Sequence, residues 1–258
     1  MTFLPKSQST SLATSTASDV FIRGESLCRE LIGQLSFTEM AFFLIVGRRP
    51  NPAQREIVDA CLVTLMEHGL TPSAISARLT YTSSPEALQA AVAAGLLGVG
   101  SLFVGTMEGA ALLLERIVMA GEPFAPHAET VAREHRDAKR PLPGFGHPLH
   151  KPDDPRTLKL YELLDQQGVA GSHTRALKAL SGAVDAVYGK HITVNATGAI
   201  AAALGDCGVP SEIMRGFALI ARCAGLVAHV HEEQHKPALR ALWEAAEAAV
   251  LYDGDQGH

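Results

Sequence analysis

The sequence has little of what marks secreted, membrane-bound or nucleic-acid-binding proteins. Only four cysteines occur among 258 residues, and their spacing shows no paired framework, which favours buried thiols in a reducing cytosol. No window holds 18 uninterrupted apolar residues, so we expect no membrane span. The net charge of −5 argues against the basic footprint of a nucleic-acid-binding protein. We therefore expect a cytoplasmic protein without a nucleic-acid or membrane partner.

Strand patterns are also nearly absent. Apolar residues make up 47% of the chain and charged residues 19%, which indicates a globular protein, and alanine and leucine recur at helical spacing. The predicted fold class is therefore all-α. The polar residues 1–20 lack the apolar core of a signal peptide, so we expect a flexible tail there. Residues 21–258 are predicted to form the folded part, with a possible small subdomain over about 140–210.

Eight helices are predicted from apolar periodicity and from capping residues. They run from Asn51 to Gly69, from Pro85 to about Val99, from Glu108 to Met119, from Asp154 to Gly168, from Ala176 to Tyr188, from Thr197 to Leu204, from Pro210 to about His235, and from Pro237 to Tyr252.

One loop between these helices, residues 143–156, concentrates unusual residues. It reads P-G-F-G-H-P-L-H-K-P-D-D-P-R, and its prolines prevent a continuous helix. Gly144 and Gly146 permit backbone conformations that other residues resist. A stiff loop that holds His147 and leads into a helix carrying Arg156 would suit an anion-binding or carbonyl-polarising site. A plain helix-breaking linker explains the composition equally well.

Two further groups of polar residues interrupt apolar helical patterns. His68 follows Glu67 at the end of a predicted helix, where it is either an ordinary C-terminal residue or, when protonated, a donor to an anion. Arg222 lies among apolar residues on the same helix side as His229. A buried arginine needs a carboxylate, which a ligand or an internal Asp or Glu would supply. Together, two histidines and two arginines (the second being Arg156) suit a small polycarboxylate.

A third pattern, H-E-x-x-H over residues 231–235, matches the zinc-protease helix signature. Both histidines would share one helix face, as zinc ligation requires. Pro237 follows the motif directly, however, and the sequence offers no evident third ligand. We predict no metal site.

The loop over residues 143–156 resembles the G-x-G-H-x-x-x-K-x-x-D-P-R loop of the citrate synthase superfamily. Residues 218–234, A-L-I-A-R-C-A-G-L-V-A-H-V-H-E-E-Q, resemble the family's A-x-A-R-x-x-G-x-x-A-H-x-x-E-Q helix, which also accounts for the zinc-like pattern. The segment E-H-G over residues 67–69 is similar to the family's substrate-histidine segment. The three matches occur in the family's order, and the helix pattern is similar over about residues 24–253.

The resemblance implies a citrate synthase-like helical fold with a large and a small domain. It also implies an enzyme for an acyl-CoA thioester and a dicarboxylic keto acid, or for their citrate-like adduct. Coenzyme A would enter as part of the substrate, without a permanently bound cofactor. Such enzymes are dimers or higher homo-oligomers in which a C-terminal arginine reaches the neighbouring site, and Arg240 or Lys236 could serve here.

The resemblance also assigns roles within the site. His147 would hold the keto-acid carbonyl or the adduct's hydroxyl, while His68, Arg156 and Arg222 would grip carboxylates. The backbone of Gly144, Phe145 and Gly146 would lie against the CoA adenine.

The departures from the family pattern matter for the activity. Full-length citrate synthases are longer and carry a thioester-polarising histidine where this chain reads Met107-Glu108-Gly109. Citryl-CoA lyases and the matching module of ATP-citrate lyase lack that histidine and resemble this chain better. In both branches an aspartate stands where this chain has Val194, and neither Val194 nor the adjacent Asn195 can exchange a proton with carbon.

Retro-aldol cleavage of citryl-CoA to acetyl-CoA and oxaloacetate is the predicted activity. It requires a base for the tertiary hydroxyl and an acid for the enolate carbon. His147 and His68 are assigned to the hydroxyl and the nascent carbonyl. Glu108 is either the acid that protonates the enolate carbon or an ordinary residue in the first turn of its helix. Asn195 is either a helix cap or a hydrogen-bond donor to the thioester oxygen. A condensing enzyme for another acyl-CoA, and a non-catalytic acyl-CoA or carboxylate-binding protein, are the alternatives.

Overall fold

The computed structural model describes residues 9–102 and 104–254. Almost all of its regular structure is helical, which confirms the predicted class. The α-helices are α1 (Phe37–Val46), α2 (Pro52–Met66), α3 (Pro72–Ser83), α4 (Leu88–Leu97), α5 (Thr106–Ala120), α6 (Phe124–Asp137), α7 (Pro155–Gln167), α8 (Ser172–Tyr188), α9 (Ala196–Asp206), α10 (Met214–His235) and α11 (Leu239–Ala249). Two short helical turns, η1 (Leu27–Leu31) and η2 (Ser211–Ile213), complete the helical structure of the described residues.

The sequence pattern missed the helices α1, α3 and α6, and it also missed a small antiparallel sheet near the N-terminus. Its strands are β1 (Ala13–Ser15), β2 (Val20–Ile22) and β3 (Glu25–Ser26), in the order β1-β2-β3. It occupies part of the segment for which we expect a flexible tail, whose first eight residues lie outside the described ranges. Strands of two or three residues are too short to show an alternating pattern.

Helix starts follow the capping chemistry of the sequence. Asn51 caps α2 through a reciprocal capping box with Gln54, and Pro52 takes the first helical position. Asp154 caps α7 by accepting the backbone N–H of Arg156, as predicted. The Asp154 cap lies at the end of α7 that borders the site, whereas α2 borders the site with its opposite, C-terminal end.

The main apolar core joins α2, α5, α6, α7, α8, α9 and part of α10. The helices of the segment 140–210, for which we expect a possible subdomain, pack into this same core through residues such as Leu160, Leu180 and Ile200. A separate, smaller cluster of Ala77, Ala91, Leu226 and Val230 joins α3, α4 and the C-terminal half of α10.

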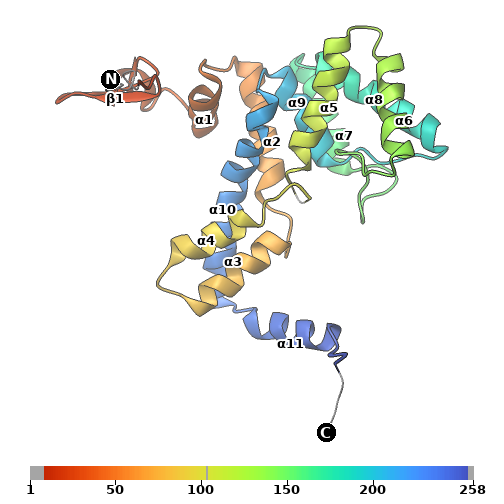
Figure 1. Ribbon diagram of the computed structural model, residues 1–258. Helices are drawn as coiled ribbons and strands as arrows, with labels where there is room; N and C mark the ends of the chain where they lie inside the picture. The colour runs from red at the N-terminus through yellow and green to blue at the C-terminus, as the bar shows by residue number, and fades with distance from the viewer. Residues whose placement is uncertain (1–8, 103, 255–258) are drawn as a thin grey trace, which may run out of the picture.

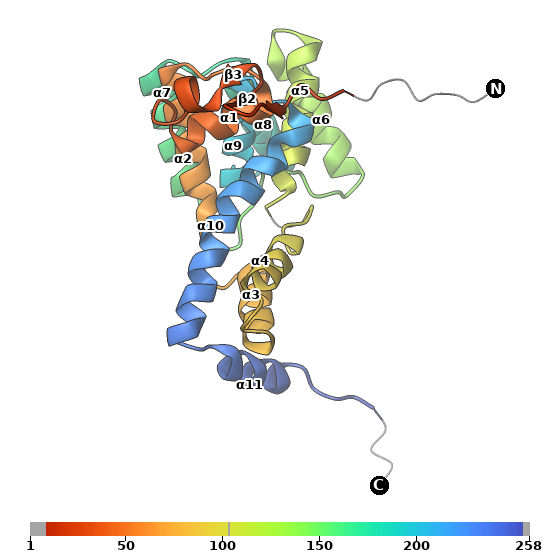
Figure 2. The same ribbon diagram turned by 90° about the vertical axis from the view of Figure 1, so that its left-hand side faces the viewer.

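The helix α10 connects the two clusters. It runs from the main body past α3 and α4, and α11 lies at its far end (Figure 1). The view at 90° shows the same arrangement, with α3 and α4 beside the lower half of α10 (Figure 2). The segment Ser211–His235 is long and apolar enough to cross a membrane by length and composition, and 44% of its most apolar window is buried within the protein. It carries the buried charged residues Arg222 and Glu233, and it packs on α2, α3 and α4 as a core helix does.

Candidate active site

A cavity of about 430 Å³ lies where α2, α7, α9 and α10 meet the loop over residues 143–156. Its size falls in the range of small-molecule sites. Seven of the residues assigned from sequence line it: His68, Phe145, Gly146, His147, Arg156, Asn195 and Arg222. The structure thus brings together segments that are up to 154 residues apart in the chain.

Three assigned residues lie elsewhere. Glu108 lies in the first turn of α5, where its carboxylate is 2.5 Å from the Arg215 guanidinium, so it takes the helix-residue role and not that of a cavity acid. Arg240 is exposed on α11 and bonds Glu244 of the same helix. Gly144 packs against Gly198 and does not line the cavity.

The loop is held against the start of α9 by backbone hydrogen bonds. The N–H of Gly146 donates to the carbonyl of Thr193 (2.8 Å), and the N–H of Asn195 donates to the carbonyl of Gly144 (3.0 Å). Gly144 and Gly146 have φ values of +86° and +79°, which confirms the need for glycine. A Cβ on Gly198 would lie 2.6 Å from the Gly144 carbonyl oxygen, so this close approach requires glycine on α9 as well.

Asn195 serves as a helix cap, which was the first of its two predicted roles. Its Oδ1 accepts the Gly198 N–H and the Thr197 hydroxyl, and its Nδ2 donates to the carbonyl of Gly146 (3.0 Å). The neighbouring Val194 is buried. Val194 therefore presents no polar side chain to the cavity.

His147 is fixed in one tautomer by the turn that follows it. Its Nδ1 accepts the backbone N–H groups of Leu149 (3.1 Å) and His150 (2.9 Å), so the proton of the neutral ring lies on Nε2. Partial burial and then the adjacent His150 lower the pKa of His147, which favours that neutral form at pH 7. Nε2 lies 3.3 Å from a terminal nitrogen of Arg156. Because both groups are then donors, an oxygen atom of a ligand could accept from both.

Arg156 is oriented by the carboxylate of Asp154, which the sequence indicated only as a helix cap. Asp154 is fully buried and accepts the Nε (2.9 Å) and a terminal nitrogen (2.7 Å) of Arg156 in a bidentate pair. Burial alone would raise the pKa of Asp154, but the bonds from Arg156 and from the backbone N–H of Ala196 outweigh it and hold that pKa below its usual value. The spacing D-P-R could have indicated the pair, since capping places both side chains on one turn.

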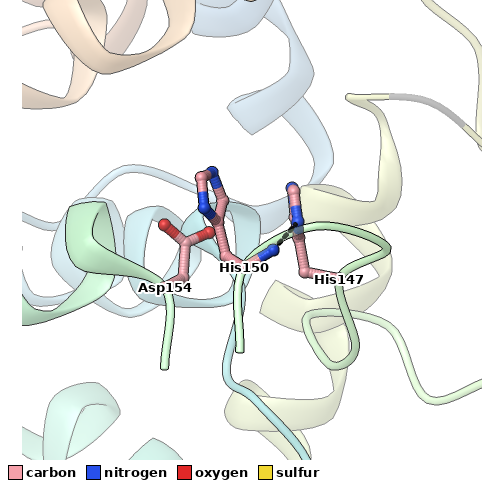
Figure 3. A group of neighbouring side chains, drawn as sticks. All are labelled: His147, His150 and Asp154. Carbon is pink, nitrogen blue, oxygen red and sulfur yellow. Dashed lines mark hydrogen bonds between the residues drawn. The ribbon is translucent and has the colours of Figure 1, made fainter. Parts of the chain in front are cut away.

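The same turn forms a cluster with metal-ligand chemistry. Ligand atoms of His147, His150 and Asp154 lie within 4.8 Å of one another, and the two imidazole rings stack at 4.3 Å (Figure 3). Both carboxylate oxygens of Asp154 already bond Arg156, and Nδ1 of His147 already accepts two N–H groups. The arrangement therefore fits an ion pair and a fixed imidazole better than a metal ion.

Arg222 is buried, with 4% of its surface exposed, and it borders the cavity. Within residues 9–102 and 104–254, its buried Nε and one terminal nitrogen have no hydrogen-bond partner. Burial lowers its pKa, and the charge of Glu67 offsets this only in part. The sequence left two alternatives for the partner of Arg222, an internal carboxylate and a ligand carboxylate. No internal carboxylate of the described residues bonds these two nitrogens, so the geometry favours a ligand carboxylate.

His68 lies beyond the end of α2, which stops at Met66. Its ring centroid is 6.0 Å from that of His147, in an edge-to-face orientation. Partial desolvation at the cavity wall, followed by the charges of Arg156 and Arg222, lowers its pKa. Of the two alternatives for His68, the protonated donor is the one that these surroundings disfavour, because they favour a neutral imidazole.

With this geometry in place, comparison with known proteins identifies the class. The family described as "Citrate synthase, C-terminal domain" matches residues 7–242, and the chain belongs to this family. The curated citrate synthase of Synechocystis is 28% identical over 206 residues, and the Bacillus subtilis citrate/2-methylcitrate synthase is 26% identical over 201 residues. The chain spans about half the length of these curated relatives.

Among solved structures, the chain is similar to the citryl-CoA lyase of Hydrogenobacter thermophilus, with 30% identity and a TM-score of 0.88. That match covers 98% of this chain and 97% of the lyase. The ATP citrate lyase of Methanothrix soehngenii, solved with citrate and coenzyme A, shares the fold at 18% identity and a TM-score of 0.79, over 98% of this chain and 43% of that one.

Proposed function

We propose that the protein is a citryl-CoA lyase that cleaves citryl-CoA to acetyl-CoA and oxaloacetate. The observation that carries this proposal is the end-to-end match to the Hydrogenobacter thermophilus enzyme, whereas the match to the Synechocystis citrate synthase covers only 50% of that protein. The cavity chemistry supports it. Arg156 and Arg222 would each hold a carboxylate of the citryl group, and the coenzyme A chain would leave past Phe145 and Gly146.

In this proposal His147 donates from Nε2 to the oxygen on the tertiary carbon, together with Arg156. Two converging donors stabilise the negative charge that develops on this oxygen as the carbon–carbon bond breaks. Thr106 and Thr197, whose hydroxyl oxygens are 2.9 Å apart, line the cavity wall nearby. The Thr197 hydroxyl donates to Asn195, so Thr106 donates to Thr197 and keeps lone pairs free to accept from a ligand.

The experiment is to incubate purified protein with citryl-CoA and to follow oxaloacetate with malate dehydrogenase. Oxaloacetate formation above background is expected, and its absence would contradict the lyase. Release of free thiol from acetyl-CoA plus oxaloacetate would favour the condensing alternative. Binding heat with a panel of acyl-CoAs, without turnover of any, would favour the non-catalytic binding protein.

We also propose that the protein forms a homodimer or a higher homo-oligomer. α11 has no buried residue, and an apolar cavity of about 680 Å³ between α3 and α11 is bordered by Leu79, Leu242 and Trp243. Trp243 is 60% exposed, and Tyr252 beyond the helix is 79% exposed. A second copy of the chain would cover these side chains and could bring Arg240 or Lys236 toward the neighbouring site.

A further inference from the structure

The described cavity wall has two histidines and two arginines but no carboxyl group. None of the residues that line it is Asp or Glu, and Val194, where the resemblance to the family places an aspartate, is a buried apolar residue. Asp154, the nearest acid of the loop, is bound by Arg156 through both oxygens, and its depressed pKa keeps it ionised. Cleavage of citryl-CoA nevertheless requires a base for the hydroxyl and an acid for the enolate carbon.

The two histidines differ in their capacity to carry a proton. Nδ1 of His147 accepts two backbone N–H groups, so a proton at Nδ1 would break both bonds, and Nε2 already carries one. His147 can therefore donate a hydrogen bond but is poorly suited to take up a proton. It stays a fixed donor through the reaction.

His68 has no such restriction. Its backbone N–H donates to Glu67 (2.8 Å), while its ring nitrogens form no hydrogen bond within residues 9–102 and 104–254. Its surroundings favour the neutral form, which has one free lone pair for a proton. The ring lies on the cavity wall, 6.0 Å from the ring of His147. An atom held by His147 is thus within reach of His68.

We propose that His68 alone carries the proton of the reaction, as base and then as acid, in place of the missing aspartate; this rests on the proposed function. A neutral ring nitrogen of His68 takes the proton from the tertiary hydroxyl of citryl-CoA. The bond between the tertiary carbon and the methylene carbon breaks, its electron pair passes to the thioester enolate, and the hydroxyl oxygen becomes the carbonyl of oxaloacetate. The imidazolium of His68 then returns the same proton to the methylene carbon, which becomes the methyl group of acetyl-CoA.

This cycle is balanced, because His68 ends neutral and no proton is gained or lost overall. One nitrogen can serve both steps because the hydroxyl oxygen and the methylene carbon are attached to the same tertiary carbon. Desolvation, and then Arg156 and Arg222, disfavour the imidazolium once it forms, so its proton returns readily to the carbanion. In the condensing direction the same residue would take the proton from the methyl group.

The test is deuterium exchange into the methyl group of acetyl-CoA in D2O with oxaloacetate present, measured by mass spectrometry for wild type, H68Q and H68A. H68Q should lose exchange and kcat about 100-fold or more, with little change in KM or in citrate binding. Added imidazole should restore part of the activity of H68A. The matched control is H231Q on the exposed side of α10, which should exchange at the wild-type rate.

The outcomes separate this proposal from the proposed function. Methyl exchange in the wild type without cleavage of citryl-CoA would overturn the lyase. The comparison of exchange by wild type and H68Q would then still decide whether His68 carries the proton in the condensing direction. Exchange by H68Q at the wild-type rate, or a loss confined to KM, would overturn the proton-carrier role and leave His68 as a carboxylate ligand. An absence of exchange in a wild-type protein that cleaves citryl-CoA would overturn the proton-carrier role and keep the lyase.

Discussion

Nε2 of His229 on α10 lies 3.0 Å from Oε1 of Glu67, next to the proposed proton carrier. Nδ1 of His229 accepts from Nε of Arg78 on α3 (3.0 Å), so its proton lies on Nε2 and is donated to Glu67. The same Glu67 oxygen accepts the N–H groups of His68 (2.8 Å) and Gly69 (2.6 Å). The conformation of the His68 turn therefore depends on a chain of bonds that begins on α3.

Replacing His229 with phenylalanine should disconnect that chain. The variant leaves the buried Arg78 without one acceptor and Glu67 without one donor, a cost of about 1–3 kcal/mol of unfolding free energy. Because His68 shifts, kcat should fall more than KM rises. Urea unfolding and steady-state kinetics measure the two effects, with H231F on the exposed side of α10 as the control. A stable H229F protein with unchanged kcat would show that the turn is held by other contacts.

The contact between Gly198 and the loop gives a second prediction. A Cβ at position 198 would meet the Gly144 carbonyl at 2.6 Å, so G198A should move the loop, lower the unfolding free energy by about 1–3 kcal/mol and reduce turnover. The matched control is G182A on α8, an exposed site with no atom within 4 Å of the added Cβ. G182A should gain up to about 1 kcal/mol and keep its activity. Equal stability of the two variants would contradict the close approach.

The sequence predicted the helical class and most of the site because those features have local signals. Caps at Asn51 and Asp154 and the glycines of the loop are set by neighbouring residues, and the structure confirms them. The burial of Arg222 followed from the apolar residues around it in the helix. These predictions needed no knowledge of which helices meet.

Other features depend on long-range contacts and could not be predicted from sequence. The ionic partners of Arg78 are Glu232 and Glu233, more than 150 residues away, and nothing local indicates these pairs. The lowered pKa of His68 depends on burial at the cavity wall and then on Arg156 and Arg222 from distant segments, whereas a helix end alone would favour the cation. The strands near the N-terminus were missed because each is only two or three residues long.

The pair of Asp154 and Arg156 predicts a dependence of stability on pH. The pKa of Asp154 is lower in the folded chain than in the unfolded one, so the pair stabilises the fold above the unfolded value near 3.8. That contribution is lost as the pH falls through the folded pKa. D154N should lower the unfolding free energy at pH 7 by roughly 3–5 kcal/mol, because the Arg156 charge loses its partner in a mostly buried pair.

Urea unfolding of wild type and D154N between pH 3 and pH 7 checks this prediction. The difference between the two proteins should shrink toward the acid end. A matched control is D165N on α7, where the exposed Asp165 lies 4.0 Å from Lys178 and should contribute little at any pH. A difference between wild type and D154N that is constant over the range would show that the carboxylate charge does not stabilise the fold.

The apolar surface of α11 predicts an assembly that depends on Trp243. In W243D a charge replaces a 60% exposed indole, so a contact between copies should weaken while the isolated chain keeps its core. Sedimentation of wild type and W243D measures the change in mass, and W243F is the conservative control. R240A should lower turnover only if the assembled protein places Arg240 in a neighbouring site. Identical masses for wild type and W243D would place the contact elsewhere.

The pH profile of turnover tests His68 as the base. Desolvation at the cavity wall, and then the charges of Arg156 on α7 and Arg222 on α10, hold the pKa of His68 below the usual 6.5. In the loop, His150 adds to this effect, Asp154 opposes it, and the ring of His147 lies 6.0 Å away. Since the base must be neutral, kcat/KM for citryl-CoA should rise with pH through that lowered pKa and then level off. R156K keeps a positive charge beside the ring and should retain the rise of kcat/KM with pH, which is the acid limb of the profile. The residual activity of H68Q should not show this rise. An acid limb that persists unchanged in H68Q would assign the titration to another group.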